Sequence, residues 1–587
     1  MRLCSGIISH SAFAAKNETS GIALRTLKAQ EMSSARVSHQ ISPTDFQMTE
    51  SGPPPRPLKA LPACIFLLGF IYLLLGIFQP LNPFDEGFIN YGAERVSYGD
   101  VPYRDFWVGY TPGQFYTVAG VFRIFGYSIL VERIWDTVVR FGICVLVLLI
   151  TQRLAGKKYA YMSFVICVVY LAWCGSYGYP VIPAMFCGLG AILLLIEFYV
   201  ARRSFLLFLG GLATGTTVLY RQDIGVYILL SAVAAMVIVS FERPVLKGQI
   251  MARGTNCFGC VVSYGLGICI LLIPCFFYFL RAVPIGVLRA DLITFPREAS
   301  RFLPLPPILP GVVLFKSSLR LHDIWFLFYA PIAIFLVGWV GLFRSFCNPV
   351  KYPEKVQQFG RAALTVFGTG LLLTVITRAD ITHCLAITIV TSALLPVLLA
   401  DWFARRRPAW STALVMLCLA LLSLPYVAAP IRRLYWYDSQ YGPRKGESVL
   451  QRARFFQVPA DEENAILFIQ QHVPEEQALF VGNSQHHRIF VNNIMFYFLS
   501  QRRAGTMYYE FEPGMTTTVQ IQRDIVADLS RNQVKYVVRC AGFDRSDNPG
   551  ENFHDSGVTI IDDFLAQKYR PVEKFGDYSI WASQQPE

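Results

Sequence analysis

The feature that most constrains this chain is a series of apolar runs, each long enough to cross a lipid bilayer. A helix of about 20 predominantly apolar residues spans the hydrocarbon core of a bilayer. Only 16% of the 587 residues are charged, whereas a typical soluble protein has about 25%. We therefore predict a polytopic α-helical membrane protein with about 11 transmembrane helices. The predicted helices lie near residues 60–80, 134–152, 159–177, 180–200, 204–220, 224–241, 258–281, 323–343, 361–377, 384–402 and 409–429.

Basic residues are concentrated on alternate connecting loops, and this pattern predicts the orientation of the helices. Lys and Arg are retained on the cytoplasmic side of a membrane. The pattern places the amino terminus in the cytoplasm, and loops 81–133 and 283–322 on the other side together with residues 430–587. The net charge of +12 then follows from topology, and no nucleic-acid partner is expected. The basic loop residues are Arg153, Lys157, Lys158, Arg202, Arg203, Arg243, Lys247, Arg253, Arg344, Lys351, Lys355, Arg361, Arg405, Arg406 and Arg407.

Three regions of different composition divide the chain. Residues 1–57 are polar and rich in Ser, and we expect a disordered cytoplasmic tail there. Residues 58–429 contain the apolar runs and form the predicted transmembrane domain. Residues 430–587 lack such runs, and short β-rich segments alternate with helical patterns. This alternation predicts a soluble extracytoplasmic α/β domain.

The carboxy-terminal region has recognisable elements of its own. A pair of histidines, His486 and His487, follows its first predicted strand. A third metal ligand at a recognisable spacing is missing, so we expect exposed loop residues here and no metal site. The predicted strands are residues 477–483, 534–540 and 577–583, and the predicted helices are residues 515–532 and 560–569.

Charged residues lie beside the apolar runs on the predicted extracytoplasmic face. Charges this close to hydrocarbon are costly, and by default they mark a functional site. Asp85 and Glu86 follow the first apolar run directly. We also predict substrate-binding roles for further residues near this face, including one aromatic ring. These residues are Arg221, Asp223, Arg378, Asp380, His383, Arg297, Arg301 and Tyr110.

The pair Asp85-Glu86 has two physical interpretations. In the first, Asp85 is a base that deprotonates an acceptor hydroxyl, and Arg221 or Arg378 stabilises a departing lipid phosphate. Arginine suits this role because its planar fork holds two phosphate oxygens at once. In the second, the two acids complement the dipole at the start of the helix that follows. Both interpretations can hold at once.

Residues 83–140 resemble the first outer loop of the GT-C membrane glycosyltransferases, such as the protein O-mannosyltransferases and the transferases that place aminoarabinose on lipid A. The shared pattern is an acid that opens the loop, a helix, a Gly-Asp, a short helix that starts at a Pro, and a Phe-Gly before an Arg. The matching residues are Asp85-Glu86, Gly99-Asp100, Thr111-Pro112, Phe125-Gly126 and Arg133 or Arg140.

This resemblance implies that Asp85 is the general base and that Glu86 positions the acceptor or the base. It implies a transfer with inversion from a polyprenyl-monophosphate sugar to an extracytoplasmic protein, lipid or glycan. No cofactor is expected, and a contribution from a divalent cation is left open. The aminoarabinose transferases carry Glu-Lys before the Pro, where this chain has Tyr110-Thr111. Arg221, Arg378 or an arginine of loop 289–301 would then replace that lysine as the phosphate ligand.

The resemblance also implies a location in a bacterial inner membrane, with the carboxy-terminal domain on the periplasmic side. Two other functions are compatible with the sequence. One is a transporter or flippase of lipid-linked saccharides. Transport predicts charged residues near the bilayer midplane and broken helices in related halves, whereas the charges here gather at one face and no internal repeat is visible, which disfavours transport. The other is an inactive GT-C-like protein that serves as an assembly partner.

Overall fold

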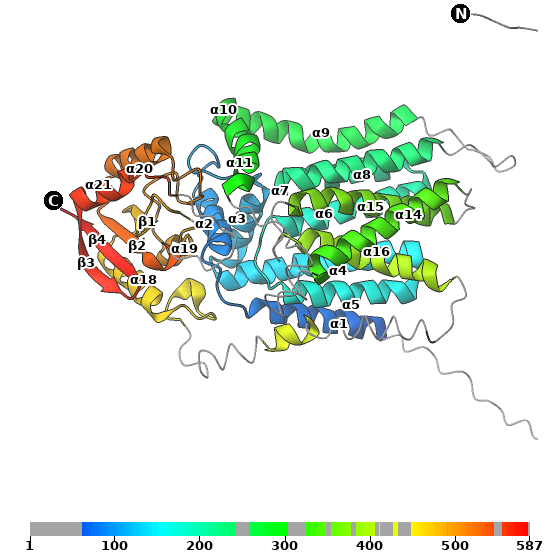
Figure 1. Ribbon diagram of the computed structural model, residues 1–587, viewed down its shortest axis with the longest axis horizontal. Coiled ribbons are helices and arrows are strands. Elements are labelled where there is room, and N and C mark those ends of the chain that lie inside the picture. Colours follow the sequence, from blue (N-terminus) through cyan, green and yellow to red (C-terminus); the bar gives the residue numbers. More distant parts are fainter. Residues whose placement is uncertain are drawn as a thin grey trace, which may run out of the picture. The chain divides into compact units, whose positions relative to one another are not determined.

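The apolar runs form a bundle of helices that lie side by side in the computed structural model (Figure 1). The helices are α1 (Leu61–Leu74, extended by the 3-10 turn Leu75–Ile77), α4 (Ile129–Ala155), α5 (Lys157–Trp173), α6 (Val181–Ala201), α7 (Ser204–Tyr220), α8 (Gln222–Phe241), α9 (Cys257–Ala282), α14 (Ala330–Cys347, preceded by the π-helical turn Trp325–Tyr329), α15 (Glu354–Val375) and α16 (Leu385–Phe403). The structure describes residues 61–241, 257–302, 325–347, 354–376, 383–404, 410, 426–432, 448–489, 491–544 and 555–584.

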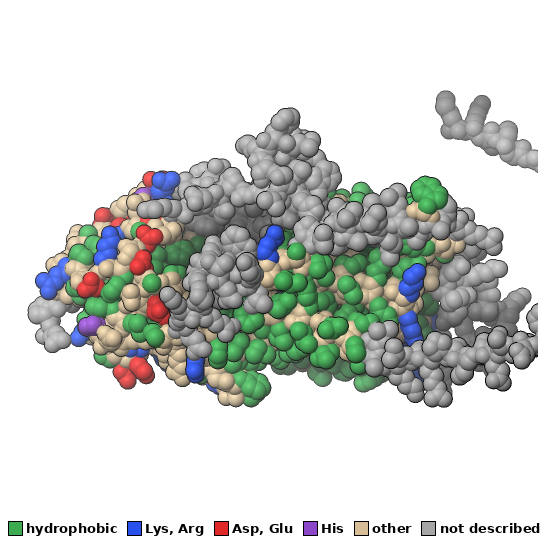
Figure 2. Space-filling view, turned by 90° about the horizontal axis from the view of Figure 1, so that it is seen from below, with side chains coloured by type: hydrophobic (Ala, Val, Ile, Leu, Met, Phe, Trp, Pro, Cys, Tyr) green, Lys and Arg blue, Asp and Glu red, His purple; other side chains and the backbone are tan. Residues whose placement is uncertain are grey.

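These helices match the predicted runs, except that the run 409–429 lies largely outside the described residues. Five segments of the described chain are long and apolar enough to cross a membrane, and three shorter apolar helices accompany them. On the face of the bundle seen in Figure 2, hydrophobic side chains cover most of the described surface. The five segments are Ile129–Ala155, Val181–Ala201, Phe258–Ala282, Leu327–Arg344 and Leu385–Phe403, and the shorter helices are Pro62–Ile77, Ser204–Tyr220 and Gln222–Val237.

The connection between α1 and α4 contains two helices, α2 (Asp85–Ser97) and α3 (Gly113–Phe125). The predicted helix starts are confirmed, since α2 begins at the acid pair and α3 directly after Pro112. Gly99 and Gly126 follow the two helices with φ angles of 95° and 91°. Only glycine adopts this backbone region readily, which explains the Gly-Asp and Phe-Gly positions.

A second connection follows α9 and remains helical over its described part. It consists of α10 (Ile285–Arg289), the π-helical turn Ala290–Thr294 and α11 (Phe295–Phe302). The Trp107 indole donates a hydrogen bond to Asp291 at 3.1 Å, and the Phe295 ring packs edge-on against the Trp107 ring at 4.7 Å. This connection therefore rests on the segment between α2 and α3.

The carboxy-terminal region contains a four-stranded mixed sheet in the order β1-β2-β4-β3. β1 pairs with β2 in parallel, whereas β4 is antiparallel to both of its neighbours. The predicted strands and helices are present, and α18, α19 and β3 are additional. The elements are α18 (Ala460–His472), β1 (Leu479–Asn483), α19 (Met495–Ser500), α20 (Val519–Arg531), β2 (Tyr536–Cys540), α21 (Ile560–Lys568), β3 (Tyr569–Phe575) and β4 (Tyr578–Ser583).

The expectation of an exposed His486 is wrong. Its side chain is fully buried, and its backbone N–H and Nδ1 lie 2.8 and 2.9 Å from the two carboxylate oxygens of Asp562. The imidazole packs against Phe480 and Phe511, with ring centroids 5.9 and 5.8 Å apart. Burial lowers the pKa of His486, so the neutral ring is favoured. The residue is part of the core that joins α21 to the sheet.

Helices α7 and α9 approach each other through glycine. A Cβ atom added at Gly267 would meet the backbone of Phe208 and Leu212, and one added at Gly211 would meet the Tyr264 carbonyl. By contrast, Gly265 on the same helix α9 faces open space. Close backbone packing through small residues is a common way to join helices within a membrane.

We expect Gly267→Ala to lower the stability of the protein, because the added methyl group forces α7 and α9 apart. The matched control is Gly265→Ala, which adds the same methyl group without a clash and should be neutral or slightly stabilising. Thermal unfolding of the detergent-solubilised variants measures the difference. Equal unfolding temperatures for the two variants would contradict the packing described here.

Candidate functional site

The start of α2 is fixed by Asn82. Its Oδ1 accepts hydrogen bonds from the backbone N–H groups of Phe84 and Asp85 at 3.1 and 2.9 Å, and its own N–H donates to Glu86 Oε2 at 3.1 Å. Asp85 and Glu86 therefore both lie in the first turn, where carboxylates complement the helix dipole. The capping interpretation agrees with this geometry.

Asp85 and Glu86 have different surroundings. Asp85 remains partly accessible, and its Oδ2 accepts a hydrogen bond from Asn82 Nδ2 at 2.9 Å and lies 3.5 Å from the Tyr177 hydroxyl. Glu86 is buried, with 1% of its surface exposed. Its two oxygens accept from Arg133 Nε and Nη2 at 2.6 and 2.7 Å. A ligand can therefore approach Asp85, whereas Glu86 is enclosed by protein.

Arg133 joins the loop to the spanning helix α4. Besides Glu86, its guanidinium donates to the backbone carbonyls of Ile77, Gln79 and Pro80 at 2.6, 2.8 and 3.3 Å. It also lies over the Phe456 ring at 4.5 Å. The arginine thereby holds the end of the first apolar helix, the start of α2 and the carboxy-terminal region together.

A second buried ion pair holds the other end of α2. Glu94 accepts from Arg452 at 2.7 Å, and Arg452 also donates to the Phe498 carbonyl at 2.7 Å. Both side chains are nearly buried, at 3% and 7% exposure. Because Glu86 and Glu94 are eight residues apart, they lie on similar sides of the helix. Two arginines from distant parts of the chain therefore fix α2 along its length.

Tyr179 lies near both Asp85 and Arg221. The hydroxyls of Tyr110 and Tyr179 are 2.7 Å apart, and the Arg221 guanidinium lies 5.1 Å above the Tyr110 ring. Burial raises the pKa of Tyr179, nearby Tyr110 and Asp85 raise it further, and nearby Arg221 lowers it. The Tyr179 phenol thus lies within electrostatic range of both the carboxylate and the guanidinium.

Arg221 is held in place by Asp223. Its Nε and Nη2 donate to the two carboxylate oxygens at 2.9 and 2.6 Å, in a bidentate pair. The arginine follows α7 directly, and the aspartate lies in the first turn of α8. Of the predicted substrate-binding residues, the structure brings Arg221, Asp223 and Tyr110 together.

The carboxy-terminal region contributes a carboxyl group that the sequence did not single out. The Ala504 N–H donates to the Tyr91 hydroxyl at 2.6 Å, and the Tyr509 ring packs edge-on against the Tyr91 ring at 5.0 Å. This segment lies along α2, and Glu510 follows with only 3% of its surface exposed. Its Oε2 is buried and has no hydrogen-bond partner among the described residues.

The pKa of Glu510 is strongly shifted. Burial raises it well above its ordinary value, and the nearby carboxylates Glu512 and Asp85 raise it further. Carboxyl groups close together disfavour each other's ionised form. The site therefore places a partly accessible carboxyl group, Asp85, near a buried carboxyl group whose protonated form is favoured.

The other predicted site residues are placed differently. Arg378 and Asp380 lie outside the described residues, as does the side chain of Arg301. His383 is half-buried just before α16, and Arg297 is exposed on α11. Over the described part of the chain, no three His, Cys, Asp or Glu side chains are grouped so that they could hold a metal ion.

Comparison with known proteins gives matches among solved structures only. No protein-family model matches the sequence, and no curated protein matches it. ArnT from Cupriavidus metallidurans, bound to undecaprenyl phosphate, matches with a TM-score of 0.48 and 12% identity, over 89% of this chain and 98% of ArnT. The apo oligosaccharyltransferase of Archaeoglobus fulgidus matches with a TM-score of 0.48 and 14% identity, over 82% of this chain and 70% of that protein.

A third match is the arabinofuranosyltransferase AftD from mycobacteria, with a TM-score of 0.44 and 12% identity, over 89% of this chain and 40% of AftD. All three proteins are GT-C membrane glycosyltransferases, the group that residues 83–140 resemble.

We expect Glu86→Gln to destabilise the protein, because it leaves Arg133 charged and buried without its partner. Breaking a buried ion pair costs about 3–5 kcal/mol of stability. The control is Glu197→Gln, which breaks the more exposed pair with Arg153 and should cost less than about 1 kcal/mol. Thermal unfolding in detergent compares them, and equal effects of the two changes would contradict a structural role of Glu86.

We expect the stability of the Glu510→Gln variant to depend on pH differently from that of the parent protein. A raised pKa means that the folded state binds the proton more tightly than the unfolded state, so this residue stabilises the fold at low pH. That contribution is lost as the pH rises above the ordinary value of 4.5. The variant should therefore gain stability relative to the parent as the pH rises from about 4.5.

The groups that face Glu510 are Asp85 on α2, Glu512 on the same segment and Tyr110 before α3. The control for this experiment is Glu573→Gln at an exposed position of β3, which should track the parent at every pH. The readout is the unfolding temperature measured from pH 4 to pH 8. A constant offset between Glu510→Gln and the parent over this range would show that Glu510 is ionised in the folded protein.

Proposed function

We propose that this protein is a membrane glycosyltransferase that transfers a sugar from a polyprenyl-monophosphate donor to an extracytoplasmic acceptor, with inversion at the anomeric carbon. One observation carries this proposal. An accessible carboxylate, Asp85, is held at the start of α2 beside a bundle of apolar helices, and the Tyr179 phenol lies within range of both Asp85 and Arg221. A lipid-linked phosphate donor requires this combination of a base and a cation at a membrane surface.

The reaction follows from the roles of these groups. Asp85 accepts the proton of the acceptor hydroxyl, and the oxygen attacks the anomeric carbon on the face opposite the phosphate. The bond between the anomeric carbon and the phosphate oxygen breaks, and its electron pair leaves with the polyprenyl phosphate. The acceptor oxygen forms the new glycosidic bond, so the configuration inverts. The developing charge on the phosphate is stabilised by a cation.

Arg221 is the proposed cation. The lysine that the aminoarabinose transferases carry before the Pro is replaced by Thr111 in this chain, and the Arg221 guanidinium lies over the neighbouring Tyr110 ring. Asp223 orients the guanidinium from one edge. Arginine remains charged in poorly solvated surroundings and binds phosphate through its planar fork. Arg297, Arg301, Arg378, Asp380 and His383 remain proposed substrate contacts.

The proposed orientation places this site on the extracytoplasmic face of a bacterial inner membrane. The basic residues support it, because along the chain they fall on connections that alternate with those that carry Asp85 and Arg221. A periplasmic site also suits the donor, because polyprenyl phosphates carry activated sugars to the side of the membrane where nucleotide sugars are absent.

Transport of a lipid-linked saccharide is the second candidate function, and one observation favours it. Asp136 and Arg140 are buried within the spanning helix α4 and form a pair at 2.5 Å. Intramembrane charges can mark a transport pathway. The two functions differ in their product, since a transporter moves the saccharide without forming a new glycosidic bond.

We expect Asp85→Asn to lower transfer by about 100- to 10,000-fold, the usual contribution of a general base. The control is Asp401→Asn, the same change in a residue that pairs with Arg361 in another part of the bundle. Membranes that contain each variant would be supplied with radiolabelled polyprenyl-phosphate sugars, and incorporation into acceptors would be measured. Undiminished transfer by Asp85→Asn would refute the base assignment, and movement of label across the bilayer without transfer would favour transport.

A further inference from the structure

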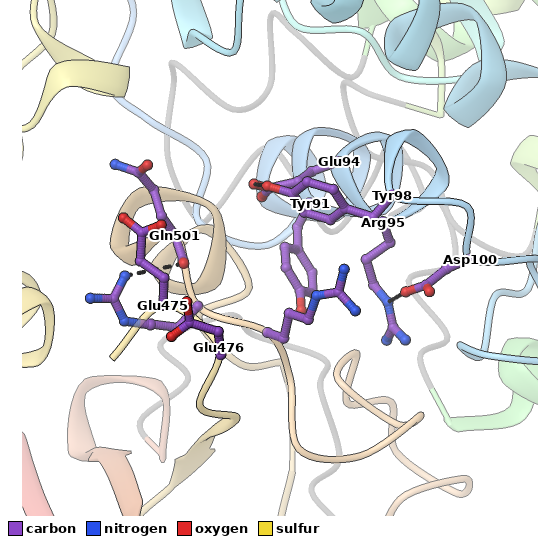
Figure 3. Close-up of a pocket in the computed structure, with 10 residues that line it drawn as sticks. Tyr91, Glu94, Arg95, Tyr98, Asp100, Glu475, Glu476 and Gln501 are labelled. Carbon is purple, nitrogen blue, oxygen red and sulfur yellow. Dashed lines mark hydrogen bonds and ion pairs between the residues drawn. The ribbon is translucent and has the colours of Figure 1, made fainter. Parts of the chain in front are cut away.

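A polar groove lies beside the carboxy-terminal half of α2 (Figure 3). Asp85 lies at the opposite end of this helix. It has a volume of about 420 Å³ and is formed between α2 and the carboxy-terminal region. A second hollow of about 580 Å³ continues it, because the two share Arg95, Asp100, Glu476 and Arg503. The groove is lined by Tyr91, Glu94, Arg95, Tyr98, Asp100, Glu475, Glu476, Gln501, Arg502 and Arg503.

Two arginines supply hydrogen-bond donors to this groove. Arg95 donates from Nε to Asp100 and from Nη2 to the Asp105 carbonyl, both at 2.8 Å. Its Nη1 is buried and has no hydrogen-bond partner among the described residues. The guanidinium of Arg503 lies over the Tyr98 ring at 4.9 Å, which supports one face and leaves its edge for a ligand. Figure 3 shows Arg95 reaching from α2 toward Asp100.

Carboxylates supply acceptors close to these donors. Asp100 pairs with Arg95, and Glu475 and Glu476 lie on the opposite side of the groove in the carboxy-terminal region. Burial lowers the pKa of Arg502, and the charges of these two glutamates act in the opposite direction. The groove therefore presents both signs of charge, with Gln501 adding an amide that both donates and accepts.

The mixture of charges selects among ligand classes. An anionic ligand, such as a lipid phosphate, would meet Asp100, Glu475 and Glu476 at close range, where like charges repel. An apolar ligand would leave these charged groups desolvated and unpaired. A sugar hydroxyl donates and accepts at the same time, so it can bridge an arginine N–H and a carboxylate oxygen. Two neighbouring hydroxyls of a saccharide can also accept from two N–H groups of one guanidinium or donate to the two oxygens of one carboxylate.

We propose that this groove binds a neutral saccharide chain and is the acceptor subsite of the protein. The inference rests on the proposed transferase function and specifies its acceptor as a glycan. Asp85 and Arg95 are ten residues apart on α2, so about 15 Å separates their positions along the helix axis. This separation corresponds to a few saccharide units, so the groove would hold the chain at a distance from the base.

The test compares binding and transfer in the full-length detergent-solubilised protein. Neutral gluco-, manno- and arabino-oligosaccharides of one to six units serve as probes, and isothermal titration measures their affinity. We expect binding that strengthens with chain length. In the double variant Arg503→Ala/Glu476→Gln the affinity should fall about ten-fold or more, since charge-assisted hydrogen bonds are lost. The control is Arg570→Ala/Glu573→Gln, a similar loss of charges at exposed positions of β3.

The outcomes separate this inference from the proposed function. The Asp85→Asn variant should bind the probes with the same affinity as the parent protein, because the substituted residue lies outside the groove. In transfer assays the groove variant should raise the KM for the acceptor about ten-fold and leave kcat nearly unchanged. The inference is overturned if no probe binds the parent protein, if the groove variant binds as well as the control, or if anionic phospholipid vesicles compete for the same residues. If the parent protein binds the probes but transfers no sugar to them, the proposed function is refuted and the groove assignment stands.

Discussion

The buried ion pair between Glu86 and Arg133 is the interaction on which the candidate site depends. Two charges removed from water carry a desolvation cost that their attraction offsets only when the remaining hydrogen bonds are made. Arg133 meets that condition, because it donates to both oxygens of Glu86 and to three backbone carbonyls. The spanning helix α4 thereby fixes the first turn of α2. Asp85, the neighbouring residue, remains partly accessible, whereas Glu86 is buried.

Helix α2 is also the surface on which distant parts of the chain meet. The Met495 N–H donates to the Pro83 carbonyl at 2.8 Å, and a Cβ atom at Gly87 would collide with the Met495 backbone. On another side, Gly92 admits the ring of Phe115 from α3. These close contacts explain why α2 has glycine at positions 87 and 92. The carboxy-terminal region is therefore part of the site architecture, since it supplies both Arg452 and the segment that carries Glu510.

The sequence predicted those features that depend on local patterns. Apolar runs, the start of α2 at Asp85, the glycine that ends it and most elements of the sheet follow from periodicity, capping and backbone preferences. Contacts between distant residues could not be predicted in this way. Nothing near Glu510 indicates that it lies against α2, and nothing near His486 indicates burial beside Asp562. Glu86 illustrates the limit, because a pair of acids in sequence does not show that one of them is enclosed by an arginine.

The two carboxyl groups of the site, Asp85 and Glu510, differ in their surroundings. Asp85 is partly accessible and lies in the first turn of α2, where the helix dipole complements a carboxylate. Glu510 is buried beside two other carboxylates, which favours the protonated form. A protonated Glu510 adds no negative charge near Asp85, whereas two ionised carboxylates at this spacing would repel each other. The raised pKa of Glu510 therefore explains how the fold accommodates a second acid close to Asp85.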